Sequence, residues 1–301
     1  MNIGVIMPQG WTGEYRGWNP VDAWARTRDV ARQSEALGFQ SIWLFDHFHT
    51  VPRPTLEITF EAFTSLAALA AETTRVRLGH VVLCAAYRNP ALTTKMISTL
   101  DVISGGRAEF GLGAGWKRDE WRAYGYGFPD APERLAILRD TLEIARAMMA
   151  EDRAAYRGKH RAVAGAINRP RPVQRPRVPI MVGGNGPNVT WRLAARYADE
   201  LNLDGLTPAE VAQALPLIRN RCEEIGRDPA SLPVSVHVWW ETLSQAGPRR
   251  VELVNAYREM GVARLIGLVR ESTDSDEALA AWAEEARAGG AELRAGTALG
   301  A

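Results

Sequence analysis

The stretch VRLGHVVLCAAYRNPALTTKMISTLDVI, residues 76–103, joins a buried strand, a polar turn and a helix in one unit. Residues 76–83 form a nearly continuous apolar run, which is typical of a strand covered on both faces of a parallel sheet. Pro90 fits the first turn of a helix, where the N–H that proline lacks has no partner in any case. The stretch therefore predicts a strand followed by a helix over 90–103.

The same alternation continues along most of the chain. Apolar, β-branched runs predict strands at residues 3–7, 41–45, 76–83, 107–111, 180–182, 200–203, 234–239 and 265–269. Amphipathic stretches between them predict helices at residues 20–37, 57–72, 90–103, 133–149, 188–197, 208–225, 248–260 and 274–288. Alternating strands and helices imply βαβ units and a parallel sheet. Eight of each predict an α/β fold, a closed (β/α)8 TIM barrel, as one domain over 1–301. A doubly wound open sheet is the alternative.

One segment does not fit the alternation. Residues 153–179 carry four prolines, at positions 170, 172, 176 and 179, and have little periodicity. A long irregular loop inside a compact barrel is uncommon, and it usually serves a function or packs as a lid or an interface. We expect an insertion loop around 153–179.

Composition excludes several classes of protein. Lysine and arginine number 36 against 35 acidic residues, so the net charge of +1 gives no field for nucleic acid. No apolar run reaches the roughly 18–20 residues of a membrane span, and the N-terminus has no basic segment typical of a signal peptide. We expect a cytoplasmic protein without nucleic-acid or membrane partners. The two cysteines, Cys84 and Cys222, lack the spacing of a disulfide framework or a zinc site.

Polar residues follow the second predicted strand, at the end of the barrel where active sites lie. The sequence there is Asp46-His47-Phe48-His49. Histidine titrates near neutral pH and serves as a general acid or base, and an adjacent carboxylate can orient it. The alternative is a loop whose polar residues cap the next helix. Two histidines without a third ligand argue against a metal site.

Two glycine turns follow later strands. Residues 111–116 read GLGAGW, and residues 183–186 read GGNG directly before the helix predicted at 188–197. Glycine lets the backbone approach a ligand closely, and a turn that leads into a helix N-terminus is suited to phosphate. The first turn lacks the GxGxxG spacing of a Rossmann fold, and either turn has a purely structural alternative.

Together these segments resemble the bacterial luciferase-like monooxygenase superfamily, and within it the branch of deazaflavin (coenzyme F420)-dependent oxidoreductases. The matching segments occur in the family's order, and the final third of the chain carries no diagnostic motif. They are SIWLFDHFH (41–49), residues 78–90, LDVISGGRAEFGLGAGW (100–116), residues 118–127 and PIMVGGNGPNVTWRLAARYAD (179–199).

The resemblance implies roles for residues around the ring of the cofactor. Asp46 is expected to contact the ring, and His47 to donate or accept the proton that accompanies hydride transfer. A bulge in the third strand, with a non-prolyl cis peptide that backs the ring, is expected at Val81 and Val82. Cys84 would then lie beside the cofactor. Considered from its own surroundings, Cys84 has no base to activate it, so an inert buried cysteine is favoured over a nucleophile.

The resemblance also implies how the cofactor's tail is held. The backbone at Ala114 and Gly115, together with Gly183, Gly184 and Gly186, is expected to bind the phosphate-bearing part. The family commonly forms dimers, so a homodimer is expected, although the sequence alone shows no interface.

The implied activity is hydride transfer between coenzyme F420 and a small organic substrate. An FMN-dependent monooxygenase that uses reduced flavin and oxygen is the alternative within the fold. A protein that only stores the cofactor does not need a titrating group at the ring. An isomerase or aldolase needs a lysine or a metal triad, and the sequence offers neither.

One departure concerns the substrate. The sugar-phosphate dehydrogenases of this branch place a catalytic glutamate at the position of Trp116, and they clamp the phosphate with lysines. This chain has three lysines, at positions 95, 117 and 159. Glucose 6-phosphate is therefore not the expected substrate. Glu120 could replace that glutamate in part, although a glutamate on a helix turn is more often solvated or ion-paired.

Overall fold

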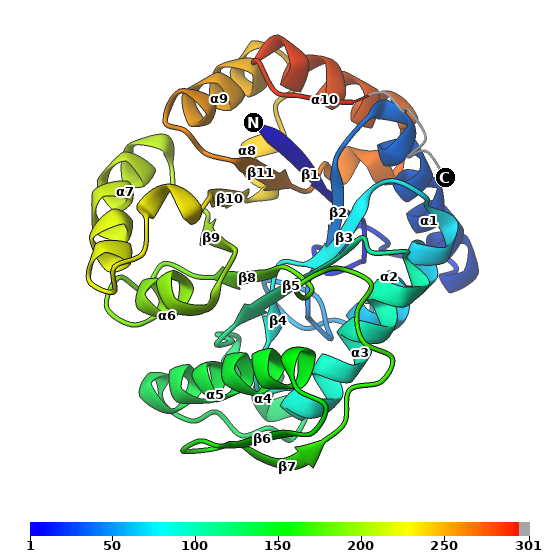
Figure 1. Cartoon of the computed structure of the whole chain (residues 1–301). Coiled ribbons are helices and arrows are strands. Elements are labelled where there is room, and N and C mark those ends of the chain that lie inside the picture. The colour runs from blue at the N-terminus through cyan, green and yellow to red at the C-terminus, as the bar shows by residue number, and fades with distance from the viewer. Residues whose placement is uncertain (295–301) are drawn as a thin grey trace.

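The strands of the computed structural model, which describes residues 1–294, close into one parallel barrel (Figure 1). Its sheet runs in the order β3-β2-β1-β11-β10-β9-β8-β5-β4, and β3 also pairs with β5 to close the ring. The strands are β1 (Asn2–Ile6), β2 (Ser41–Leu44), β3 (Arg77–His80), β4 (Leu83–Cys84), β5 (Ala108–Gly113), β8 (Ile180–Gly183), β9 (Glu200–Asp204), β10 (Val234–Val238) and β11 (Arg264–Gly267). Because β4 continues β3, this is the predicted (β/α)8 TIM barrel. Residues 295–301, which the one-domain prediction also covered, lie outside the described part.

Helices surround the barrel, as Figure 1 shows. The long ones are α1 (Pro20–Leu37), α2 (Ala62–Glu72), α3 (Pro90–Ile103), α5 (Ala131–Ala150), α6 (Thr190–Tyr197), α7 (Pro208–Glu223), α9 (Pro248–Glu259) and α10 (Asp276–Ala288). The short ones, none of which was predicted, are α4 (Arg118–Ala123), α8 (Trp240–Leu243), η1 (Pro229–Ser231) and η2 (Arg270–Thr273). The bounds of α1 and α3 agree with the prediction. The predicted start of α2 at residue 57 was wrong, because the Glu61 carboxylate accepts the N–H groups of Phe63 and Thr64 and caps the helix there.

The insertion is not irregular throughout, so the prediction of a loop was wrong over part of it. It contains an antiparallel hairpin that packs outside α5, formed by β6 (Ala154–Arg157) and β7 (Ala162–Ala166). Asp140, fully buried on α5, accepts hydrogen bonds from the Tyr156 hydroxyl and from the N–H groups of His160 and Arg161. Alanine-rich strands have little preference for β structure of their own. The contact with α5 therefore fixes the hairpin, and no local pattern reveals it.

The third barrel strand is interrupted at the position that the resemblance implied. β3 ends at His80 and β4 begins at Leu83, and the peptide bond between Val81 and Val82 is cis. Two glycines make room for this bulge. A Cβ atom at Gly113 would lie 2.6 Å from Cγ2 of Val82, and one at Gly183 would lie 2.9 Å from its Cγ1. These glycines of β5 and β8 are therefore required by close packing against the bulge.

His80, immediately before the bulge, makes stability depend on pH. Its side chain is fully buried against Phe63, and burial lowers the pKa of His80 to about 4 from an ordinary value of 6.5. Between these pH values the unfolded chain binds a proton that the native state does not, so the free energy of unfolding falls as the pH falls. This one group accounts for about 2 kcal/mol between pH 7 and pH 5. Between pH 7 and pH 5, the free energy of unfolding of a His80→Leu variant should therefore fall by about 2 kcal/mol less than that of the wild type. Urea denaturation at the two pH values measures this difference. An unchanged pH dependence would contradict the assignment.

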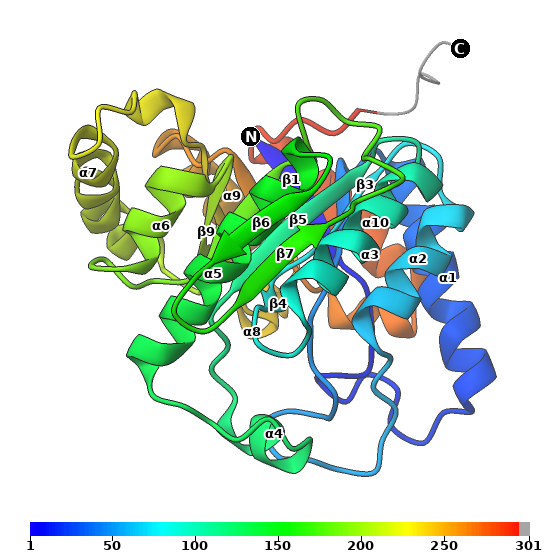
Figure 2. The same ribbon diagram turned by 60° about the horizontal axis from the view of Figure 1, so that its bottom comes forward.

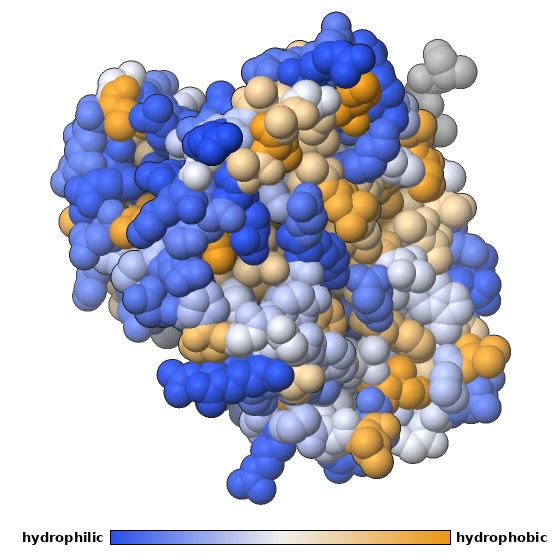
Figure 3. Space-filling model, turned by 90° about the horizontal axis from the view of Figure 1, so that it is seen from below, coloured by the Kyte–Doolittle hydropathy of each residue, from blue (hydrophilic) through white to orange (hydrophobic). Residues whose placement is uncertain are grey.

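The outer surface is mixed in character. Figure 3 shows hydrophobic side chains scattered among hydrophilic ones on the face that carries the β6–β7 hairpin. The exposed apolar side chains of α3 and the insertion are Leu92, Val102, Ile103, Ile167 and Val173. Within residues 1–294, no helix combines the length and the apolar character needed to cross a membrane. The homodimer and the cytoplasmic location stay predictions.

Candidate active site

A pocket of about 250 Å³ opens at the carboxyl ends of the barrel strands. The long loops at this end, with α4 among them, extend beyond the barrel in Figure 2. The volume is just below the usual range for ligand pockets, which suits the reactive end of a ligand whose remainder lies outside. The predicted residues that line it are Asp46, His47, Val81, Val82, Cys84, Ala114, Gly115, Gly183 and Gly184. Gly186 is not among the lining residues.

His47 is held on two sides. Its Nδ1 lies 2.7 Å from Oε2 of Glu120, and its ring stacks parallel on Trp11 with 4.2 Å between the ring centroids. Trp116 meets the same ring edge-on at 5.9 Å. Among the described residues, none bonds to Nε2 of His47. The imidazole is therefore fixed in orientation, and Nε2 is the nitrogen left for a ligand.

Glu120, on α4, is completely buried and ion-paired with His47. Of the two expected environments, solvated or ion-paired, the structure shows the second. It accepts hydrogen bonds from His47, from the N–H of Phe48 at 2.6 Å and from the Tyr87 hydroxyl at 3.0 Å. Burial raises the pKa of a carboxyl, but these donors outweigh it and hold the pKa of Glu120 below its ordinary value. Burial and the Glu120 carboxylate in turn raise the pKa of Tyr87, so the phenol keeps its proton and donates it. Glu120 is an ionised acceptor that orients His47.

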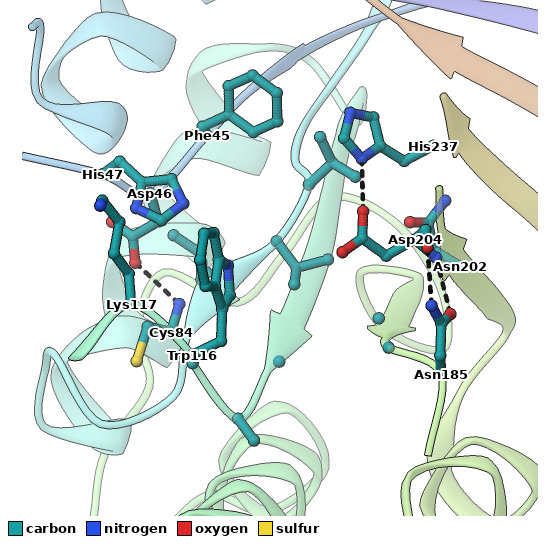
Figure 4. A pocket seen from close by; sticks show the side chains of 18 of the residues that line it. Phe45, Asp46, His47, Cys84, Trp116, Lys117, Asn185, Asn202, Asp204 and His237 are labelled. Atoms are coloured by element: carbon teal, nitrogen blue, oxygen red, sulfur yellow. Dashed lines mark hydrogen bonds and ion pairs between the residues drawn. The ribbon is translucent and has the colours of Figure 1, made fainter. Parts of the chain in front are cut away.

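Asp46 lines the pocket, but its carboxylate already has partners in the protein. Both oxygens accept from the guanidinium of Arg88, each at 2.8 Å. One of them also accepts the N–H of Cys84 at 2.9 Å, as Figure 4 shows. The side chain is only 1% exposed. Asp46 therefore ties the end of β2 to the bulged third strand, and its carboxylate has little exposed surface left for a ligand.

Cys84 is expected to be unreactive. Burial raises the pKa of its thiol to about 12, and the thiolate is the nucleophilic form. Treatment of the native protein with iodoacetamide at pH 8, followed by mass spectrometry, should leave Cys84 unmodified, whereas denaturation in urea should expose it. Cys222, also buried with a raised thiol pKa, is the matched control. Rapid modification of Cys84 alone would contradict this.

The glycine turn after β8 uses some of its polar groups within the protein. Gly184 donates its N–H to the carbonyl of Asn202 at 2.9 Å, so that N–H is not available to a phosphate. The N–H groups of Asn185 and Gly186 have no partner among the described residues. The same holds for Ala114 in the earlier turn. These groups remain for an anionic ligand.

Sequence reasoning missed the far wall of the pocket. Asp204 is the last residue of β9, Asn202 lies two residues before it, and His237 is the next-to-last residue of β10. Figure 4 shows them across the pocket from His47 and Trp116. The signal was present, because the predicted strands 200–203 and 234–239 end within two residues of Asp204 and His237 and barrel strand ends face the site. Within residues 1–294 no group of three His, Cys, Asp or Glu side chains is placed to hold a metal ion.

The family model of luciferase-like monooxygenases matches residues 1–300. The chain belongs to the luciferase-like monooxygenase family. The chain is 32% identical over 216 residues to a protein from Kineococcus radiotolerans that is named F420-dependent glucose-6-phosphate dehydrogenase. The alignment covers 70% of this chain and 62% of that relative. The chain is 35% identical over 172 residues to a protein of the same name from Microbacterium testaceum, covering 57% and 50%. The chain thus spans less than two thirds of the length of these relatives.

Structures of other proteins share the fold of this luciferase-like chain. An F420-dependent secondary alcohol dehydrogenase in complex with an F420–acetone adduct has a TM-score of 0.78 at 20% identity, covering 93% of this chain and 98% of the other. The coenzyme F420-dependent tetrahydromethanopterin reductase from Methanopyrus kandleri has a TM-score of 0.75 at 18% identity, and the match covers 94% of this chain and 97% of the other. A monooxygenase from Streptomyces bottropensis has a TM-score of 0.75 at 21% identity, and the match covers 95% of this chain and 98% of the other. At these identities the likeness establishes the barrel.

Proposed function

We propose that the protein is an oxidoreductase that transfers hydride between coenzyme F420 and a small organic substrate. The observation that carries the proposal is His47, which is held by a buried carboxylate and a stacked indole beside the bulge at Val81 and Val82. The names of the relatives and of two structural neighbours supply the cofactor. F420 carries out the hydride chemistry, and the protein binds, orients and shields it.

The residues present fit such a cofactor. The bulge and Cys84 form one wall of the pocket, and glycines at 113 and 183 bring β5 and β8 close to that wall. Free N–H groups at Asn185 and Gly186 suit a phosphate-bearing tail at the rim. The bulge would hold a planar ring, and the turn would hold its phosphate-bearing tail.

The chain's own contribution to the chemistry is a proton at His47. The Glu120 carboxylate can only accept, so Nδ1 of His47 carries a hydrogen, and Nε2 is the atom that exchanges a proton with the substrate. In alcohol oxidation Nε2 accepts the hydroxyl proton, and in carbonyl reduction it donates one. The Trp11 ring excludes water from one face of the imidazole.

We propose a substrate without a phosphate group. Of the described residues that line the pocket, Lys117 is the one lysine or arginine, and its Nζ is already paired with Asp119 at 3.0 Å. Trp116 occupies the position of the glutamate expected in sugar-phosphate dehydrogenases. This differs from the substrate named for the relatives.

The test is a fluorescence titration of the purified protein with F420 and, separately, with FMN. We expect micromolar or tighter binding of F420 and much weaker binding of FMN. The reverse result would move the protein to the FMN-dependent monooxygenases and make oxygen uptake the next assay. Binding of neither would refute the phosphate role of the glycine turns.

A further inference from the structure

A second histidine–carboxylate pair faces the pocket from the wall opposite His47. Nδ1 of His237 lies 2.9 Å from Oδ1 of Asp204 (Figure 4). The His237 side chain is 5% exposed, whereas that of Asp204 is 44% exposed. The other oxygen of Asp204, Oδ2, has no hydrogen-bond partner among the described residues. The pair thus presents one carboxylate oxygen to a ligand.

The backbone holds this pair rigidly. His237 of β10 stands directly opposite Asp204 of β9 in the strand register. The side-chain amide of Asn185 bonds both to the carbonyl of Asp204, at 2.7 Å, and to its N–H, at 2.9 Å. The rings of Phe45 and Trp239 pack on the imidazole. Asp204 is therefore oriented before any ligand arrives, which lowers the cost of binding.

Of the carboxylates among the described lining residues, Asp204 is the one with an oxygen atom, Oδ2, that accepts no hydrogen bond from the described residues. Asp46, the other carboxylate among the described lining residues, is committed to Arg88 and to the N–H of Cys84. An ionised carboxylate only accepts hydrogen bonds, so the group it meets must be a donor. Phosphate or carboxylate at this place would be repelled.

The walls beside Asp204 are aromatic. Trp239 lies 6.1 Å from Trp11 between ring centroids, and Trp11 lies 4.4 Å from Phe45. All three rings line the pocket. Such walls suit an apolar or aromatic body, with Asp204 as its polar anchor.

We infer that Asp204, positioned by His237, anchors a hydroxyl or protonated amino group on an aromatic or apolar substrate. The inference rests on the proposed function in that it assigns this ligand as the substrate rather than the cofactor. It makes Asp204 a specificity residue: charge-assisted hydrogen bonds are the strong ones, so an ammonium binds more tightly than a hydroxyl, and an anion is rejected.

The test uses three probes of one shape, namely benzylamine, benzyl alcohol and benzoate. Binding is followed by NMR of the histidine ring protons, which is tractable because the chain has five histidines. A His237→Gln spectrum assigns the reporter signal. We expect benzylamine to bind wild type most tightly, benzyl alcohol less tightly and benzoate not at all.

Asp204→Asn should lower the affinity for benzylamine by about tenfold or more. Asp29→Asn, which removes an equal charge from the exposed face of α1, should leave it unchanged.

His237→Gln is the second variant, because it keeps the charge of Asp204 and removes only its positioning partner. It should weaken benzylamine by less than Asp204→Asn does. The inference would be overturned if wild type bound benzoate as tightly as benzylamine. It would also be overturned if Asp204→Asn, with normal thermal melting, bound benzylamine as tightly as wild type does. A tenfold loss of F420 affinity in Asp204→Asn would show that Asp204 binds a hydrogen-bond donor of the cofactor. That result would also overturn the inference, which assigns the donor to the substrate. Failure of wild type to bind F420 refutes the proposed function alone, since the probe series is read without cofactor.

Discussion

Replacement of His47 by alanine is expected to lower turnover by roughly 10²–10⁴-fold, the usual contribution of a general acid or base. The affinity for F420 should stay nearly the same, because the walls and turns that fit the cofactor do not include the imidazole. Turnover is measured from the absorbance of F420 with whichever alcohol or ketone reacts in a screen, and affinity is measured by fluorescence titration.

His49→Ala is the matched control for this experiment. His49 lies two residues away and is buried, but it is not among the lining residues, and its Nδ1 contacts the carbonyl of Thr50 at 3.2 Å. This variant should keep its turnover. Equal losses of binding and rate in His47→Ala would show that His47 holds the pocket together instead of exchanging a proton.

Replacement of Arg88 by leucine is expected to cost about 3–5 kcal/mol of unfolding free energy, the usual result of removing one partner of a buried ion pair. The reason is that the Asp46 carboxylate, 1% exposed, would keep only the N–H of Cys84 as a partner. Arg88 also bonds to Glu61 at 2.8 Å and lies over the ring of Phe63, so its loss loosens the start of α2 as well. Urea denaturation at pH 7 measures the change.

A double variant separates charge from packing. Asp46→Asn combined with Arg88→Leu leaves no buried charge unpaired, because the Glu61 side chain is 42% exposed. It should therefore recover more than half of the stability that Arg88→Leu alone loses. If the double variant is as unstable as the single one, the cost comes from the contacts of Arg88 with Glu61 and Phe63 instead. In either case the effect is on stability, in contrast to the effect of His47→Ala on rate.

The difference between these two variants follows from the partners of two adjacent residues, whose roles at the cofactor ring stay predictions. Asp46 and His47 are adjacent, and the resemblance assigned both to the cofactor ring. In the structure they point to different partners: Asp46 to Arg88, and His47 to Glu120. Adjacent residues after a strand face different surroundings, so adjacency does not give two side chains one role.

Local pattern was sufficient for the barrel itself. The bounds of α1 and α3 were predicted from an amphipathic repeat that begins at a proline, and the structure adds an asparagine cap before each proline. The cis peptide between Val81 and Val82 was expected from the resemblance, and the structure confirms it. The hairpin of β6 and β7 was missed because it depends on Asp140, a residue of α5 more than ten positions away.

The sequence by itself determined the order of strands and helices, the end of the barrel that holds the site, and His47 as the candidate acid or base. Each of these follows from periodicity and from the position of a residue relative to its own strand. Only the tertiary structure decided that Glu120 is buried against His47, and that Asp204 and His237 form the opposite wall. These pairs lie 73 and 33 residues apart in the chain. Closure of the barrel brings distant strand ends together, and hydrogen bonds between them depend on distances that no local pattern encodes.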